Sequence, residues 1–319
     1  MHLRLLIYFA IFTFQADTLP ARAQNSVLNV NVVRSCPSHT AWRAPRPRCT
    51  DSAIFFVHGL FGTEDTWRNE RTGNLFPQLV RTDPDLEAYD IYSVVYTTTR
   101  IGHSPDVRTI AEELFRTMLP FYRRYEQIVF IAHSLGGNLV RNHVVELKSR
   151  FGHNALNRIR LLILLGTPIE GAYLGRAGTF VLPNPQIRTL VTLNSNDYLG
   201  LLNSTFLKAS QKHEQGGCPS MRIFSAFERR KTYSQLIVEE QSATKGAFAC
   251  KGFDADHLEL AKPANANSPI YRSVKRLLVD CLTDNPGVCP MPRSKCDFLG
   301  GLFDEVEVSS TPCNRSWPE

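Results

Sequence analysis

Residues 128–140 read Ile-Val-Phe-Ile-Ala-His-Ser-Leu-Gly-Gly-Asn-Leu-Val, and this stretch decides the fold. Its first five side chains are apolar, which predicts a strand that is buried on both faces. Ser134 then stands on a tight turn, and Leu139 and Val140 belong to an apolar helix that starts directly after it. A buried strand followed at once by a helix is typical of a parallel sheet.

The same alternation of strand and helix extends through most of the chain. Residues 107–122 have helical spacing, with apolar side chains at positions 110, 114, 118 and 121. Helices between strands that are apolar on both faces indicate an α/β fold, in which a mostly parallel sheet is covered by helices on both sides. The predicted strands are Ser52–Val57, Asp90–Tyr96, Gln127–Ala132, Ile159–Leu165 and Met221–Phe227, with Leu236–Val238 as a further candidate.

Ser134 is a candidate nucleophile because of its neighbours. A nucleophile on a strained turn needs small residues two positions before and two positions after it, so that the strand and the helix can approach closely. Ala132 and Gly136 occupy those positions. The alternative is a serine that only caps the helix. Upstream, a second buried run at residues 54–57 is followed directly by His58-Gly59-Leu60.

These segments resemble the α/β-hydrolase superfamily. The turn is similar to its nucleophile elbow, Gly-x-Ser-x-Gly, with Ala132 in place of the first glycine. Together with Thr66-Trp67, Leu-Gly-Thr-Pro at 165–168 and Asp-Ala-Asp-His at 254–257, it resembles the serine-esterase and lipase branch that includes GPI inositol-deacylase-like proteins. The resemblance covers roughly residues 51–280 and implies ester hydrolysis, often of lipids.

The resemblance also assigns the oxyanion hole and the base. It implies that the backbone N–H groups of Leu60 and Leu135 bind the oxyanion, the second of them at the positive end of a helix. His58 is expected to orient its loop, because the base of this superfamily follows the nucleophile in the chain. His257, in the loop before the final helix, is therefore the expected base. The alternative for His257 is a surface histidine beside acidic neighbours.

The triad carboxylate is the least determined member, since several acidic residues lie in the permitted part of the chain. Glu228 directly follows the strand at 221–227, where the superfamily usually carries this group, so we predict it as the acid. Glu239 and Glu240 are the second choices, and Glu170 is the third. Each of them could equally be a solvated loop charge.

Residues 168–220 interrupt the alternation and predict a lid or cap insertion, since long loops within a domain are often functional. Glycines at 171, 175 and 178 match neither a dinucleotide-binding loop nor a P-loop, and we interpret them as hinges. Phe61 and Trp67 are the predicted substrate-binding residues, because apolar surface around the site would suit an acyl chain. These side chains could equally pack the lid onto the core.

The two ends of the chain differ from its middle. Residues 1–23 predict a secretory signal peptide, because His2 and Arg4 precede a short apolar run and Ala-Arg-Ala at 21–23 offers small residues for cleavage. Residues 24–50 predict an irregular lead-in, residues 51–280 the hydrolase domain and residues 281–319 a disulfide-rich tail. No later segment is long enough to span a bilayer.

The cysteines point to an oxidising compartment. All eight follow the predicted cleavage point and none forms a Cys-x-x-Cys pair, which favours four disulfides over a zinc site. Of the many connectivities, the one with the shortest loops joins position 36 with 49, 218 with 250, 281 with 289, and 296 with 313.

The composition is that of an ordinary globular protein, with 43% hydrophobic and 21% charged residues among 319. It excludes disorder, collagen and coiled coil as descriptions of the whole chain. The net charge of +6 is scattered, which suits peripheral contact with an anionic membrane surface and offers no argument for nucleic-acid binding.

With the resemblance, the sequence predicts a secreted or periplasmic serine hydrolase that cleaves carboxylic esters. The expected substrate is a lipid ester or a small-molecule ester, and the resemblance favours the lipid. The hydrolase would act through an acyl-enzyme on Ser134 and need no metal or other cofactor. The alternatives are an acyltransferase on the same fold and a catalytically inactive, secreted lipid-binding protein.

Overall fold

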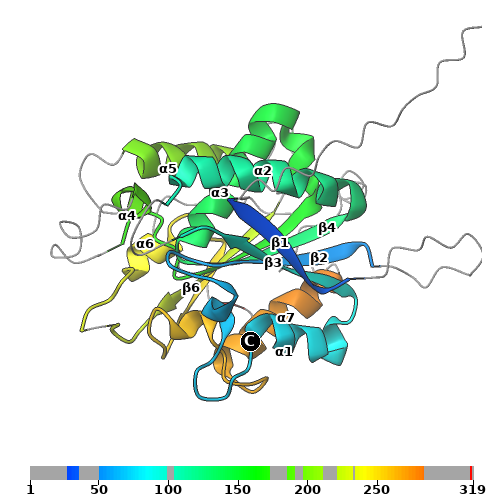
Figure 1. Cartoon of the computed structure of the whole chain (residues 1–319), viewed down its shortest axis with the longest axis vertical. Coiled ribbons are helices and arrows are strands. Elements are labelled where there is room, and N and C mark those ends of the chain that lie inside the picture. Colours follow the sequence, from blue (N-terminus) through cyan, green and yellow to red (C-terminus); the bar gives the residue numbers. More distant parts are fainter. Residues whose placement is uncertain are drawn as a thin grey trace, which may run out of the picture.

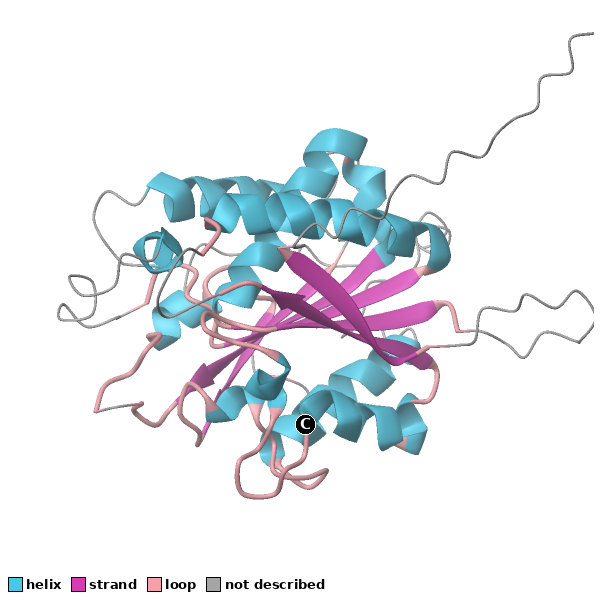
Figure 2. Ribbon diagram, viewed as in Figure 1, coloured by secondary structure: helices cyan, strands magenta, loops and turns pink. Residues whose placement is uncertain are grey.

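A seven-stranded sheet forms the centre of the protein (Figure 1, Figure 2). The structure is a computed structural model and describes residues 27–35, 50–98, 104–172, 185–190, 197–210, 221–232, 234–283 and 317. The strand order is β1-β3-β2-β4-β5-β6-β7, and every pair is parallel except β1 with β3. The predicted mostly parallel sheet is therefore confirmed. The strands are Leu28–Arg34 (β1), Ser52–Val57 (β2), Tyr89–Tyr96 (β3), Gln127–His133 (β4), Ile159–Leu165 (β5), Arg222–Glu228 (β6) and Ala249–Phe253 (β7).

Helices cover both faces of this sheet. Val107–Arg124 (α2), Leu135–Phe151 (α3) and Asp197–Ser210 (α5) lie on one face, and Phe76–Thr82 (α1) and Pro269–Leu282 (α7) lie on the other (Figure 1). Two further short helices are Pro185–Leu190 (α4) and Glu240–Thr244 (α6), and single turns of 3₁₀ helix occur at Glu64–Trp67, Pro84–Leu86, His153–Arg158 and Glu259–Ala261.

Each face has its own hydrophobic core, because successive strand side chains point to opposite sides. Phe55 and Phe130 pack beneath α2 and α3, whereas Ile54, Phe56 and Ile131 pack against α1 and α7. This arrangement explains why the central strands read as continuous apolar runs, since neither face meets water.

The two edge strands differ from the sequence expectation. Residues 28–34 were expected in an irregular lead-in, but they form β1, whose outer side chains Asn29, Asn31 and Val32 are exposed. β7 contains Lys251 and Gly252 and has no apolar run. Edge strands are covered on fewer sides than central ones, so the apolar pattern that marks a central strand is weak in both.

One other expectation needs correction. Residues 236–238 are not a strand and form a bend between β6 and α6. The sequence also favours a helix at 187–202; residues 187–190 belong to α4 and residues 197–202 to α5, and residues 191–196 lie outside the described residues.

Trp317 belongs to the hydrophobic core on the face of the sheet covered by α1 and α7. Trp317 is 2% exposed and packs edge-on against Phe224 and Phe253. Its indole N–H donates a hydrogen bond to the Ser225 carbonyl at 3.2 Å. Most of the predicted tail, residues 284–316 with 318 and 319, lies outside the described residues, as do the predicted signal peptide and much of the predicted lid.

Cys250 and Cys281 are both disulfide-bonded. The expected partners, Cys218 and Cys289, lie outside the described residues, as do the other four cysteines. Among the helices that the structure describes, none combines the length and the apolar character needed to cross a membrane.

Candidate active site

Ser134 stands on a strained turn between β4 and α3. Its backbone angles are φ 52° and ψ −126°, a conformation that side-chain-bearing residues rarely adopt and that is typical of functional sites. The side chain makes no capping hydrogen bond to α3, so the interpretation of Ser134 as a simple helix cap is wrong. The Ser134 N–H donates instead to the Leu165 carbonyl at the end of β5, at 2.9 Å.

Glycines allow the backbone segments around Ser134 to meet. A Cβ atom on Gly136 would lie 2.3 Å from the His58 carbonyl oxygen and 2.4 Å from that of Val57. A Cβ on Gly59 would lie 2.7 Å from the Ser134 Cβ. Neither position can carry a side chain without moving the backbone, so the start of α3, the serine and the loop after β2 form one close contact.

The two predicted oxyanion donors lie on either side of this contact. Leu60 follows Gly59, and Leu135 is the first residue of α3, where backbone N–H groups lack helical partners. Neither N–H has a hydrogen-bond partner within the described chain. Both are therefore free to bind an anionic oxygen, and the helix places its positive end there.

His58 and Thr98 fix the loop that carries Leu60. The His58 Nδ1–H donates to the Gly59 carbonyl at 2.8 Å, while His58 Nε2 accepts from the Tyr96 N–H at 3.2 Å. Phe61, with φ 58°, donates its N–H to Thr98 Oγ1 at 2.9 Å. Burial lowers the pKa of His58 to about 4, so the ring is neutral and each nitrogen has one fixed role. His58 thus orients its loop.

The structure brings His257 and Glu228 together. His257 Nδ1 lies 2.7 Å from Glu228 Oε2, and the Glu228 side chain is fully buried. The other carboxylate oxygen accepts the backbone N–H groups of Ile237, at 2.7 Å, and Val238, at 3.0 Å. Three donors therefore fix the carboxylate. Residues 236–238, mistaken for a strand in the sequence, supply two of them.

The alternative carboxylates lie elsewhere. Glu170 forms an ion pair with Lys245, and Glu239 and Glu240 are exposed at the start of α6. Within the described residues, none of the three contacts His257. Of the acidic candidates, Glu228 is the one with the geometry of a triad acid.

Backbone contacts hold His257 beside the elbow. Its N–H donates to Thr232 Oγ1 at 2.9 Å, and its carbonyl accepts the Nε2–H of His133 at 2.8 Å. Its ring lies against Gly166, where φ is 56° and a Cβ would be 3.0 Å from His257 Nδ1. His133 directly precedes Ser134, and Gly166 directly follows Leu165, whose carbonyl accepts the Ser134 N–H. These contacts therefore hold His257 close to Ser134.

Within the described residues, no hydrogen bond joins Ser134 Oγ to the His257 ring. In hydrolases without substrate, this contact is often long and tightens only when substrate binds. Ser134 is 9% exposed and His257 is 5% exposed, so both lie at the floor of the site rather than on an open surface.

The two predicted substrate-binding residues lie in different environments. Phe61 is half-buried in the loop beside Leu60, next to the proposed oxyanion hole. Trp67 is fully buried and packs edge-on against Phe56 and Phe76, so its ring has no surface to offer a substrate, and a substrate role does not fit. Sequence motifs alone could not separate an aromatic residue near the site from one in the core. Residues 173–184, within the predicted lid, lie outside the described residues.

The described residues contain no group of three or more His, Cys, Asp or Glu side chains placed to hold a metal ion. Of the described residues, Ser134, His257 and the N–H groups of Leu60 and Leu135 are grouped where a reacting group could bind.

The chain belongs to the family described as "Putative serine esterase (DUF676)", which matches residues 50–237. It is thus a serine-hydrolase-type member of the α/β-hydrolase superfamily, as the resemblance implied. The matched range includes Ser134 and Glu228 and ends before His257.

Similar proteins include Protein SERAC1 from Bos taurus and from Homo sapiens. They are 24% and 23% identical over 274 residues, and each match covers 76% of this chain and 41% of the relative. The chain therefore spans about two fifths of the length of these relatives.

Among solved structures, similar chains are the mature lipase BlEst2 of Bacillus licheniformis and a lipase-esterase related protein of Clostridium acetobutylicum. The TM-scores are 0.49 and 0.45, with 16% and 12% identity. Each match covers 78% of this chain and 97% of the other.

Buried neutral histidines predict a loss of stability in acid. Burial lowers the pKa of His143, on α3 beneath Tyr122, to about 3. Between about pH 3 and 6.5 the unfolded chain binds a proton here and the folded chain does not, so stability rises with pH in this window and levels off above it. The free energy of unfolding, measured by chemical denaturation between pH 5 and 6.5, should rise with pH less steeply in His143→Gln than in the wild type, by about 1 kcal/mol per pH unit. An unchanged slope would mean that His143 does not stay neutral in the folded protein.

Proposed function

We propose that this chain hydrolyses carboxylic esters through an acyl-enzyme on Ser134. His257 is the base, and Glu228 orients it. The observation that carries the proposal is the 2.7 Å contact of His257 Nδ1 with the buried Glu228, next to a serine with a strained backbone. A carboxylate in this position fixes the tautomer that leaves the other ring nitrogen free to accept the serine proton.

The reaction proceeds in two half-reactions. Ser134 Oγ attacks the ester carbonyl while His257 Nε2 takes the hydroxyl proton, and the oxygen of the tetrahedral intermediate binds to the N–H groups of Leu60 and Leu135. Collapse breaks the bond to the leaving alkoxide, which receives the proton from His257. Water then attacks the acyl-enzyme in the same way and releases the carboxylic acid and the free serine.

We propose a lipid ester as the substrate class. Two apolar side chains beside the site support this assignment. Phe61 follows the proposed oxyanion donor Leu60 and is half-buried, and Leu258 follows His257 and is 40% exposed. Apolar surface at the entrance favours an acyl chain over a small polar group and would also suit contact with a membrane surface.

A fluorophosphonate tests the activated serine without any choice of substrate. We expect covalent labelling of Ser134, located by mass mapping, and its loss in Ser134→Ala and His257→Ala. An ester series of increasing chain length on the same samples then tests the lipid assignment. A folded protein that neither reacts with the probe nor hydrolyses any ester would support the inactive lipid-binding alternative.

The identity of the acid is tested by four separate substitutions. Glu228→Ala should lower kcat by several orders of magnitude, because loss of the orienting carboxylate costs about 10⁴ in a serine protease. Glu170→Ala, Glu239→Ala and Glu240→Ala are the matched controls and should retain kcat within a few fold, since none of these side chains contacts His257. Equal small losses in all four variants would contradict the proposed triad.

We propose that the protein is exported to an oxidising compartment, secreted or periplasmic. The signal-like pattern of residues 1–23, the position of all eight cysteines after it, and the disulfide-bonded state of Cys250 and Cys281 support this proposal.

Strong reductant should lower the melting temperature markedly, because a native disulfide commonly contributes about 2–4 kcal/mol. Thermal denaturation with and without reductant, together with thiol titration of the denatured protein, measures the effect. Eight titratable thiols together with an unchanged melt would refute both the disulfides and the proposed export.

A further inference from the structure

Arg141 is a cation in the interior of the protein. It is 1% exposed, and within the described residues no carboxylate lies within ion-pair distance of its guanidinium. It stands on α3 seven residues after Ser134, which places the two residues on the same side of the helix, two turns apart. Burial of a charge is costly unless hydrogen bonds compensate it. For Arg141, two hydrogen bonds of the same kind provide this compensation.

The guanidinium is bound to two asparagine side chains. Its Nη1 donates to Asn138 Oδ1 at 2.9 Å, and its Nη2 donates to Asn203 Oδ1 at 2.6 Å. The Phe206 ring of α5 packs against the guanidinium, at 4.7 Å from its central carbon. Arg141 therefore connects the helix that follows the nucleophile with α5.

Each asparagine also donates a hydrogen bond to the turn at residues 166–170, which follows β5. Asn138 Nδ2 donates to the Pro168 carbonyl at 3.0 Å, and Asn203 Nδ2 donates to the next carbonyl, Ile169, at 2.9 Å. Because an amide has one accepting end and one donating end, the guanidinium sets the orientation of both amides. The planar guanidinium holds its two donors in a fixed geometry, which the compact ammonium group of a lysine on its flexible stem would not reproduce.

The turn that receives these bonds adjoins the active site. It follows Leu165, whose carbonyl accepts the Ser134 N–H, and begins with Gly166, against which the His257 ring lies. On its far side, the Glu170 N–H donates to Ser242 Oγ at 3.0 Å, and that hydroxyl donates to the Gly171 carbonyl at 2.9 Å. The turn is thus held by α3 and α5 from one side and by α6 from the other.

We infer that Arg141 is a positioning residue that, through Asn138 and Asn203, holds the 166–170 turn in the place that seats the His257 ring beside Ser134. The inference deepens the proposed function and rests on it, because the His257 ring is the proposed base. A buried apolar side chain would fill the same volume without the cost of a buried charge. The two oriented amides explain why a guanidinium is retained there, although no carboxylate of the described residues pairs with it.

Asn203→Asp separates positioning from stability. The new carboxylate still accepts from Arg141 and supplies the missing counter-charge, but it has no N–H to donate to the Ile169 carbonyl. We expect a melting temperature close to that of the wild type and a kcat lower by roughly tenfold or more, since a displacement of about 1 Å in an active site can cost a hundredfold. KM should change much less than kcat, because the turn acts on the base.

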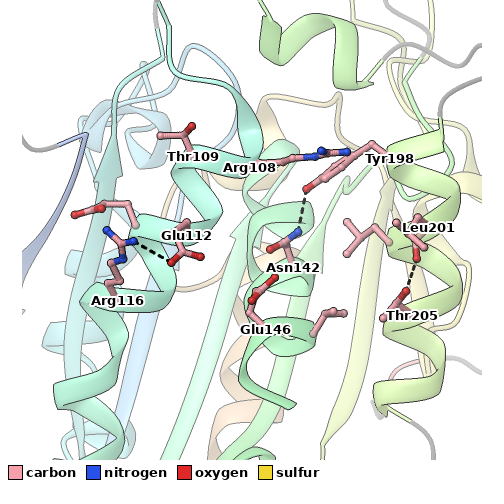
Figure 3. A pocket seen from close by; sticks show the side chains of 12 residues that line it. Arg108, Thr109, Glu112, Arg116, Asn142, Glu146, Tyr198, Leu201 and Thr205 are labelled. Atoms are coloured by element: carbon pink, nitrogen blue, oxygen red, sulfur yellow. Dashed lines mark hydrogen bonds and ion pairs between the residues drawn. The ribbon is translucent and has the colours of Figure 1, made fainter. Parts of the chain in front are cut away.

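Two further variants complete the design. Asn142→Asp is the matched control, because Asn142 neighbours Arg141 on α3 but donates to the Tyr198 hydroxyl, at 3.3 Å, in a groove of about 750 Å³ between α2, α3 and α5 (Figure 3). It should retain wild-type kcat. Arg141→Lys keeps the charge and loses the fork, and it should show the same fall in kcat as Asn203→Asp.

Hydrogen exchange of peptides that cover residues 164–172 provides a readout independent of activity. Faster exchange in Asn203→Asp than in Asn142→Asp is expected. A wild-type kcat in a folded Asn203→Asp variant would overturn the inference and leave the proposed function intact. If the wild type itself neither reacts with fluorophosphonate nor turns over esters, the proposed function fails. In that case hydrogen exchange alone tests whether Arg141 positions the turn. Equal exchange in Asn203→Asp and Asn142→Asp would then overturn the inference.

Discussion

The close approach of α3 to the end of β2 is the constraint on which the site depends. Gly136 lies so near the carbonyls of Val57 and His58 that no side chain could stand there. This one contact sets the start of α3, forces Ser134 into its strained conformation and brings the loop with Leu60 to the same place. One close contact between backbone segments therefore positions the proposed nucleophile and both proposed oxyanion donors. This arrangement exists before any substrate binds.

Neutral buried histidines hold the loops around the contact between α3 and the end of β2. Burial lowers the pKa of His133 to about 3, with His257 as the next influence, so its ring remains uncharged beside the proposed base. It donates from Nε2 to the His257 carbonyl, as His58 donates from Nδ1 to the Gly59 carbonyl. A neutral imidazole in a dry site can fix a backbone carbonyl without adding a charge that would repel the imidazolium formed during catalysis.

The central part of the fold could be predicted because its physical cause is local. Strands such as Ile159–Leu165 are buried on both faces, and a run of apolar side chains is the direct trace of that environment. The edge strands β1 and β7 leave a weaker trace, because polar and small residues such as Asn29, Asn31 and Gly252 are tolerated where a strand has few neighbours. Trp67 was misplaced for a related reason: an aromatic residue near a motif can face the site or the core, and its chain position is the same in both cases.

The sequence by itself determined the kind of turn at Ser134, since only small residues at 132 and 136 permit it, and it supplied a histidine and a glutamate in the order that the superfamily uses. Only the tertiary structure decided which carboxylate meets His257. Glu228 is 29 residues from His257, and the bend at 237 and 238 that holds its second oxygen has no pattern that reveals its role. The sequence did not reveal the role of Arg141 either. Its two asparagine partners come from α3 and α5, and they donate hydrogen bonds to the backbone carbonyls of residues 168 and 169. Backbone amides and carbonyls carry no side-chain identity, so contacts made through them become visible only when the chain is folded.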